Sequence, residues 1–220
     1  MADKKGMGAA ALFALLNIIY IVLLLNVDVK AVGPADTSVG LSTINMAFSG
    51  LIGMNMFWYK FTQLLGVMSF AVCGIFVCIG VVQLVRQKSI KKVDRCLPML
   101  GGLYMMTLAL YILFEKVIIN YRPVIMEGET APEASFPSSH TMMACVVFGS
   151  AAMVLSQYIK NESRLALLRL ICFAAIALMV IGRMLSGVHW LSDIIGGALI
   201  SAFLLSVFGW LLGTEKAAVD

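Results

Sequence analysis

The sequence contains two histidines, His140 and His189, and each lies in a polar stretch that adjoins a long apolar run. His140 belongs to residues 136–141, and His189 belongs to residues 182–193. An imidazole can attack an electrophilic centre or exchange a proton near neutral pH, because its ordinary pKa is about 6.5. If the fold brings the two rings together, one can act as a nucleophile and the other as a general acid.

His189 and Asp193 are four residues apart, which would place them on one face of a helix, one turn from each other. A carboxylate that accepts the Nδ1 proton fixes the imidazole tautomer and leaves Nε2 free to attack. His140 can then protonate a leaving alkoxide. Two histidines and one aspartate can also bind a metal ion, but the nearby cations and the lack of an HExxH motif disfavour a metal site. We therefore predict no metal and no cofactor.

Five further residues are suited to binding an anion. Arginine forks match phosphate oxygens and lysine supplies a compact charge, so Lys116, Arg122 and Arg183 can form a clamp. Ser138 and Ser139 stand where an apolar run begins, and the N–H groups of a helix start favour phosphate. A single cation at a membrane surface commonly extends toward headgroups instead. Three cations beside both histidines favour phosphate binding.

The composition indicates a membrane protein. Hydrophobic residues make up 61% of the chain and charged residues 13%, and the mean hydropathy is +0.96. A soluble domain is roughly half apolar and a quarter charged, so the bilayer is the natural solvent here. The five cysteines show no disulfide framework and no zinc-ligand spacing. Nothing in the charge pattern indicates a nucleic-acid surface.

We expect an all-α polytopic membrane protein in which residues 1–220 form a single domain of six spanning helices. Residues 7–27 are interpreted as an uncleaved span, since the apolar run is longer than a signal-peptide core. The predicted spans lie at about residues 7–27, 63–85, 97–114, 141–158, 165–181 and 191–212.

The connections between the spans also have recognisable patterns. Residues 41–53 are too short to cross a bilayer and are expected either to lie in the interface or to re-enter the membrane partway. The aromatic residues at 57–61 are typical of a headgroup anchor, with an entrance for lipid as the alternative. Prolines keep residues 124–136 non-helical.

The distribution of lysine and arginine predicts the orientation. With both termini in the cytoplasm, most of these residues lie inside, above all in segment 86–95. The same topology places the ends of spans three and five and the starts of spans four and six at the outer face. The candidate active site is therefore expected at the outer membrane face, where the topology brings together Lys116, Arg122, His140, Arg183, His189 and Asp193.

The spacing of these residues resembles the type 2 phosphatidic acid phosphatase superfamily, the membrane-embedded lipid phosphate phosphatases. The family signatures are K-x6-R-P, P-S-G-H and S-R-x5-H-x3-D. Here they read Lys116, five residues and Arg122-Pro123; then Pro137-Ser138-Ser139-His140; then Gly182-Arg183, five residues, His189, three residues and Asp193. Six spans are also similar to the family plan, so the resemblance covers most of the chain.

The resemblance implies a role for each matching residue. His189 would be the nucleophile that forms a phosphohistidine, and Asp193 would orient it. His140 would protonate the leaving group and later activate water. The phosphoryl oxygens would be held by Lys116, Arg122, Ser138, the backbone around Ser139, and Arg183. No metal or cofactor is implied.

Three positions depart from the family signatures. Ser139 replaces a glycine, which preserves the backbone N–H donor, and Gly182 replaces a serine, which removes a hydroxyl. Lys116 is one residue closer to Arg122 than the signature requires, and Glu115 occupies the expected position. One residue displaces a side chain by about 100° around a helix.

The resemblance implies metal-independent hydrolysis of a lipid phosphate or diphosphate, such as phosphatidic acid, phosphatidylglycerol phosphate or undecaprenyl diphosphate. A phosphotransferase using the same histidine is one alternative. A non-catalytic lipid-binding or transport protein, which would tolerate loss of His189, is the other. The expected partners are the lipid phosphate and membrane lipids, the expected location is a bacterial cell membrane, and the oligomeric state is not predicted.

Overall fold

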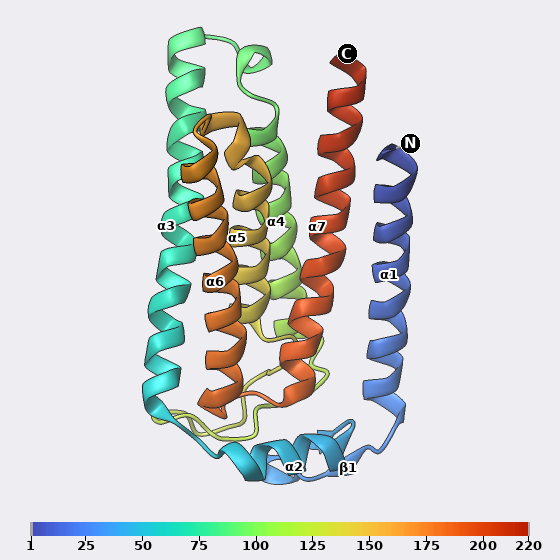
Figure 1. Ribbon diagram of the computed structural model, residues 1–220. Helices are drawn as coiled ribbons and strands as arrows, with labels where there is room; N and C mark the ends of the chain where they lie inside the picture. Colours follow the sequence, from blue (N-terminus) through green and yellow to red (C-terminus); the bar gives the residue numbers. More distant parts are fainter. Residues whose placement is uncertain (1, 220) are drawn as a thin grey trace.

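The computed structural model describes residues 2–219, with side chains described for residues 6–213. Among these described residues, six helices are long and apolar enough to cross a membrane, which confirms the predicted all-α polytopic class. The side chains of Lys4, Lys5 and Lys216, which contribute to the predicted orientation, lie outside the described residues. The long helices are α1 (Ala2–Asn26), α3 (Met56–Gln87), α4 (Cys96–Lys116), α5 (Ser139–Tyr158), α6 (Glu162–Ser186) and α7 (Leu191–Val219) (Figure 1).

Short elements connect these helices. Strands β1 (Lys30–Ala31) and β2 (Ser38–Val39) pair antiparallel around the 3-10 helix η1 (Pro34–Asp36). Helix α2 (Ser42–Ile52) lies across the end of the bundle, roughly perpendicular to the long helices (Figure 1). This helix lies within residues 41–53, which the sequence predicted to be too short to span. A second 3-10 helix, η2 (Ile90–Lys92), joins α3 to α4 at the opposite end.

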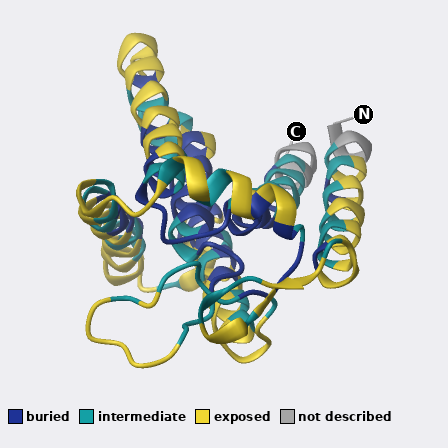
Figure 2. Cartoon of the chain, turned by 90° about the horizontal axis from the view of Figure 1, so that it is seen from below, coloured by how far each residue is buried: buried dark blue, intermediate teal, exposed yellow. Residues whose placement is uncertain are grey.

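Helix α5 forms the centre of the bundle. In its most apolar stretch 67% of the residues are buried, whereas the same fraction is 11–39% in the other five spanning helices. It packs against α3, α4, α6 and α7, while α1 packs along α7. Figure 2 shows buried residues gathered at the middle of the bundle and exposed residues on its outward faces. The exposed faces of α1, α3, α4 and α6 are rich in large apolar side chains, as expected for surfaces in contact with lipid.

Helix α3 begins at Met56, whereas the sequence predicted a span from residue 63. The Asn55 side chain caps this helix by accepting the backbone N–H groups of Phe57 and Trp58. The aromatic residues 57–61 therefore occupy the first turns of α3, and their role as a headgroup anchor stays a prediction. This early start places polar residues of α3 beside α5 and α6.

Both chain ends lie at one end of the bundle, and the loops that carry the candidate residues lie at the other (Figure 1). Residues 117–138, the 187–190 turn and α2 all meet there. The site is therefore far from the termini, as the predicted topology requires. Which end faces the cytoplasm stays a prediction.

Candidate active site

A tight turn between α6 and α7 places His189. Gly187 ends α6 in the left-handed conformation, with φ at 68°, which glycine adopts without a steric penalty. A Cβ atom at this position would lie 1.9 Å from the backbone oxygen of Gly53, just before α3. Only glycine fits this close approach, and it allows the chain to fold His189 into the bundle. The His189 side chain is 4% exposed.

Two glycines of α7 allow the loop that leads into α5 to pack directly against the α7 backbone. A Cβ at Gly196 would lie 2.2 Å from the ring of Phe136, and a Cβ at Gly197 would lie 2.9 Å from the Ser138 carbonyl oxygen. The Ser138 backbone N–H donates to the Asp193 carbonyl over 2.9 Å. These contacts hold the start of α5 against the first turn of α7.

The hydroxyl of Ser135 bridges His189 and Asp193. Ser135 Oγ donates to Asp193 Oδ2 over 2.5 Å and lies 3.0 Å from Nδ1 of His189. The direct distance from Nδ1 to Oδ2 is 3.8 Å. Because an ionised carboxylate only accepts, the hydroxyl proton points to Asp193 and the serine oxygen accepts the Nδ1 proton of His189. The chain of bonds therefore leaves the lone pair on Nε2.

Asp193 is fully buried and accepts two further hydrogen bonds. Its Oδ1 accepts from the Asn120 amide over 3.0 Å, and its Oδ2 accepts from the Trp190 backbone N–H over 3.0 Å. The indole of Trp190 donates to the Tyr121 carbonyl over 2.7 Å, which ties the turn to the loop before α5. A buried carboxylate with three donors is held in one orientation.

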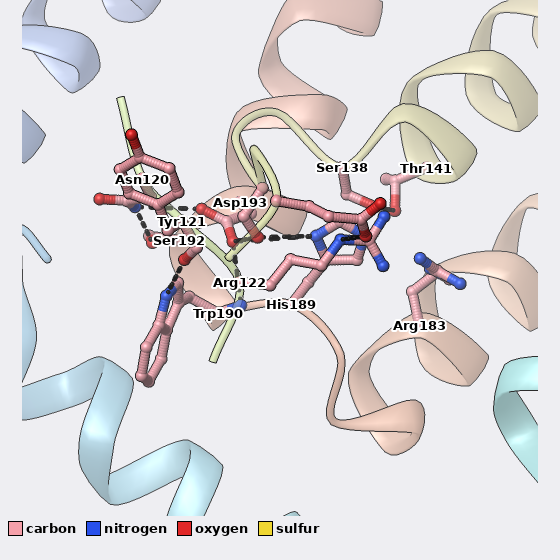
Figure 3. A network of polar contacts seen from close by, with 12 residues as sticks. Asn120, Tyr121, Arg122, Ser138, Thr141, Arg183, His189, Trp190, Ser192 and Asp193 are labelled. Atoms are coloured by element: carbon pink, nitrogen blue, oxygen red, sulfur yellow. Dashed lines mark hydrogen bonds and ion pairs between the residues drawn. The ribbon is translucent and has the colours of Figure 1, made fainter. Parts of the chain in front are cut away.

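Several buried polar atoms at the centre of the site have no hydrogen-bond partner among the described residues. These atoms are Nε2 of His189, Nε and Nη2 of Arg183, and Nε of Arg122. Figure 3 shows Arg183, Ser138 and Thr141 on the side of the imidazole away from Asp193. Buried polar groups are normally paired, so unpaired donors beside an unpaired nitrogen fit an anion that carries oxygen atoms.

The environment keeps His189 neutral. Burial, followed by the positive charges of Arg183 and Arg122, lowers the pKa of His189 well below its ordinary value. The ring therefore retains a lone pair at neutral pH, where a nucleophile needs it.

Arg183 is fully buried in α6 and is held by α3. Its Nη1 donates to Thr62 Oγ1 over 3.3 Å, and its guanidinium carbon lies 5.6 Å from the centre of the Tyr59 ring. Gly182 makes this packing possible, because a Cβ there would lie 2.6 Å from the methyl group of Thr62. The glycine that replaces the family serine thus has a steric reason in this chain.

Arg122 lies in the loop before α5, directly after Tyr121, which forms an isolated antiparallel bridge with Ala134. Its backbone N–H donates to the Glu133 carbonyl over 3.0 Å, and its Nε lies 3.2 Å from the Glu133 carboxylate. The two charged groups are close enough to form an ion pair, but Nε of Arg122 does not make a hydrogen bond to the carboxylate. Arg122 can therefore turn toward another anion without losing a well-formed bond.

His140 is the second residue of α5 and is half-buried. Its Nε2 contacts Oε1 of Gln63 on α3. Ser139 begins α5, and the Oγ of Ser138 accepts a hydrogen bond from Thr141 over 3.1 Å. The two serines therefore stand at the helix start that the sequence predicted, although α5 begins two residues before the predicted span.

The structure unites most of the predicted site residues but leaves Lys116 apart. His189, Asp193 and Ser138 are joined by the contacts above, and Arg122 and Arg183 act on His189 through their charges. Lys116 ends α4 with an exposed side chain and forms no hydrogen bond or ion pair with the described residues. Its phosphate-binding role stays a prediction.

Sequence reasoning missed five polar residues of the site. Ser135 and Asn120 belong to the loop before α5, and their positions follow no spacing rule relative to Asp193. Tyr59 and Thr62 belong to the start of α3, which was not predicted to be helical, and Gln63 lies at the first position of the predicted span. Ser135 lies three residues before Ser138, in the connection 124–136 that was recognised as non-helical, and this closeness was the one available signal.

The fold and the site define a polytopic membrane protein with a buried histidine–serine–aspartate arrangement facing two arginines. The family model of the PAP2 superfamily matches residues 98–216, more than half of the chain. The chain belongs to the PAP2 superfamily. All eight predicted site residues, from Lys116 to Asp193, lie within the matched region.

One solved structure supports the fold independently. The chain is similar to a crystal structure described as the first transmembrane PAP2 type phosphatidylglycerolphosphate phosphatase from Bacillus subtilis. The TM-score is 0.66 and the identity is 17%, with 94% of this chain and 96% of the other covered. A search of curated proteins finds no match. The protein is therefore an integral membrane protein with the PAP2 architecture.

Proposed function

We propose that this protein hydrolyses a phosphate monoester or diphosphate of a membrane lipid through a phosphohistidine at His189. The observation that carries the proposal is the unpaired, buried Nε2 of a neutral His189 beside the unpaired nitrogens of Arg122 and Arg183. A nucleophile without a partner, beside two arginines that keep donor nitrogens without hydrogen-bond partners, is complementary to a phosphoryl group. Membership of the PAP2 superfamily and the similarity to a phosphatase structure support the same activity.

In the first step, Nε2 of His189 attacks phosphorus and an N–P bond forms. The P–O bond to the lipid breaks, its electron pair moves to the lipid oxygen, and a protonated His140 gives its proton to that oxygen. Arg122 and Arg183 stabilise the charge on the remaining phosphoryl oxygens. The hydrogen bonds from Nδ1 of His189 through Ser135 to Asp193 stabilise the positive charge that develops on the imidazole.

In the second step, the now neutral His140 accepts a proton from water. The water oxygen attacks phosphorus, the N–P bond breaks, and its electron pair returns to Nε2 of His189. Inorganic phosphate leaves, and His140 is protonated again for the next cycle. His140 thus acts first as an acid and then as a base.

An open cleft of about 450 Å³ leads to Arg122 and supports a lipid-headgroup substrate. It lies between the start of α3 and the loop before α5, so a headgroup could reach the site from the membrane surface. Phosphatidic acid, phosphatidylglycerol phosphate and undecaprenyl diphosphate are the proposed substrates, with the site facing outward. The cleft is lined by Met56, Tyr59, Lys60, Arg122, Met126, Glu127, Glu129 and Glu133.

The test is phosphate release by detergent-purified protein from each of these three lipids, with excess EDTA and beside a His189→Ala control. We expect release that resists EDTA and disappears in His189→Ala. With a nitrophenyl phosphate, whose leaving group needs no acid, a phosphoenzyme that is labile in acid and stable in base should accumulate in His140→Ala but not in His189→Ala. Release abolished by EDTA would replace the proposal with metal chemistry, and a product that forms only with a lipid or sugar acceptor would indicate a phosphotransferase.

A further inference from the structure

One face of α3 completes the site from outside the region that the family model matches. That region begins at residue 98, whereas Tyr59, Thr62 and Gln63 lie on the first two turns of α3. Residues three and four apart on a helix share a face, so these side chains point in one direction. Thr62 and Tyr59 contact Arg183, and Gln63 contacts His140. A single helical turn therefore supports both a predicted phosphate-binding cation and the predicted general acid.

The amide of Gln63 is oriented by its second partner. Its Nε2 donates to the hydroxyl oxygen of Tyr59 over 2.9 Å, which directs the amide oxygen toward His140. An amide oxygen can only accept a hydrogen bond, so the Nε2 of His140 that it contacts must carry a proton. The contact thus selects the protonation of one ring nitrogen as well as the ring orientation.

Gly66, one turn further along α3, gives the imidazole its space. A Cβ at this position would lie 3.1 Å from Cδ2 and 3.4 Å from Nε2 of His140. The ring therefore packs directly on the α3 backbone, with Gln63 at its nitrogen. Helix α3 fixes His140 through both shape and hydrogen bonding.

We propose that Gln63 is a positioning residue that holds His140 as the general acid for the leaving lipid oxygen, with Tyr59 holding the Gln63 amide. This inference rests on the proposed phosphatase function. An acceptor at Nε2 stabilises the protonated imidazole, because the protonated ring donates from both nitrogens. Loss of the acceptor removes this support and frees the ring to rotate away from the leaving oxygen.

The inference separates two kinds of leaving group. An alkoxide must be protonated as it leaves, whereas a nitrophenolate leaves without a proton because its conjugate acid is far stronger. A residue that acts only through His140 as an acid therefore matters for an alkyl phosphate and not for a nitrophenyl phosphate. A residue that only stabilises the bundle affects both substrates alike.

The experiment measures kcat/KM for phosphatidic acid and for a dodecyl-substituted nitrophenyl phosphate, which shares a long apolar chain. This parameter reports the steps through release of the leaving group, so hydrolysis of the phosphohistidine does not enter it. The variants are Gln63→Leu, which removes the acceptor, Gln63→Glu, which keeps an acceptor oxygen, and Tyr59→Phe, which removes only the hydroxyl that orients the amide. Size-exclusion profiles and thermal unfolding check that each variant is folded.

For Gln63→Leu, we expect kcat/KM to fall about tenfold or more on phosphatidic acid and to change by less than about twofold on the aryl substrate. Gln63→Glu should restore most of the activity on phosphatidic acid, and Tyr59→Phe should show a smaller loss with the same selectivity. Equal losses on both substrates, or wild-type activity of Gln63→Leu on phosphatidic acid, would overturn the inference. Absence of release by the wild-type protein from either substrate would instead overturn the proposed function, so the two failures are distinguishable.

Discussion

Ser135 stands between His189 and Asp193, with its hydroxyl 3.0 Å from Nδ1 of the imidazole and 2.5 Å from the carboxylate. The sequence predicted direct contact, because the two residues are four apart. That spacing gives one helical face only if both residues are helical, and α7 begins at Leu191. His189 lies in the preceding turn, its ring is displaced from the carboxylate, and the serine occupies the space between them.

Replacing Ser135 with alanine should lower kcat because it leaves the Nδ1 proton of His189 without its acceptor and removes one of the three hydrogen bonds to the Asp193 carboxylate. An unsatisfied buried polar group costs about 1–3 kcal/mol, which corresponds to about 5- to 150-fold in rate if it acts in the transition state. The loss should appear with alkyl and aryl phosphates alike, since it affects the nucleophile. Steady-state kinetics on both substrates provide the measurement.

The matched control for this serine is Ser201→Ala. Ser201 is equally buried, and its hydroxyl donates to the backbone carbonyls of Met142 and Gly197. The Ser201→Ala variant should keep kcat within about twofold of the wild-type value, since the substitution removes no contact with a residue of the site. A kcat of Ser135→Ala that matched this control would show that the bridge is dispensable.

His189 should remain neutral in mildly acidic solution, protonated at Nδ1. An ordinary histidine is mostly protonated at pH ~5.5, but burial and two arginines lower the pKa of this one. Because the folded pKa lies below the unfolded one, the linked stability falls as pH drops below about 6.5. The chain has two histidines, so in the His140→Gln variant only His189 remains. Nitrogen NMR of this variant, with 15N-labelled histidine, therefore reports the protonation of the His189 ring alone. An Nε2-protonated ring would contradict the proposed nucleophile.

Restoring the family serine at Gly182 should destabilise the protein. The new Cβ would lie 2.6 Å from the Thr62 methyl group, and overpacking of this kind typically costs about 1–3 kcal/mol. Thr62→Ser removes that methyl group and keeps the hydroxyl that binds Arg183. The double variant should therefore recover most of the stability lost in Gly182→Ser. Thermal unfolding of the four proteins in one detergent gives the coupling between the two sites, and simple additivity would rule out the clash.

Lys116→Ala should change kcat/KM by less than about threefold, since the side chain is exposed and its charge is screened by solvent. Arg183→Lys should lower kcat/KM about 100-fold, because a lysine loses the fork geometry within a buried site. Arg183→Lys shows how large the loss is when a phosphate-binding cation is impaired. Comparing Lys116→Ala with it shows whether Lys116, shifted by one residue from the signature, still acts as such a cation. A large loss in Lys116→Ala would mean that the lysine reaches the substrate despite its exposed resting position.

Glu133→Gln should strengthen binding of phosphate. The Glu133 carboxylate lies 3.2 Å from Nε of Arg122, so it competes with a substrate anion for that cation. The pair is partly exposed, and such pairs contribute about 0–1 kcal/mol, which limits the expected fall in the inhibition constant of inorganic phosphate to about fivefold. Glu127→Gln, at another carboxylate of the same cleft, is the matched control. Equal effects of the two variants would show that the loss of one negative charge anywhere in the cleft is sufficient, and that the ion pair with Arg122 plays no special part.

The membrane fold could be read from hydropathy because each spanning helix satisfies its own backbone within one continuous segment. Helix α3 was predicted to start too late, because a polar connection with Gly, Pro and Ser merges into an aromatic run with no apolar boundary. The deciding interaction is local, the capping of the first turn by the Asn55 side chain. This error in one boundary hid the contributions of Tyr59 and Thr62.

The sequence by itself determined the fold class and the chemistry-bearing residues, because hydropathy acts within each segment and the signatures join residues close in sequence. Only the tertiary structure decided how these segments meet. Ser135 bridges His189 to Asp193, and Gln63 reaches His140 across 77 positions of the chain. Such contacts depend on the approach of α3, α5 and α7 at glycines such as Gly66 and Gly196. No periodicity within a single segment encodes that approach, since it arises from packing between helices.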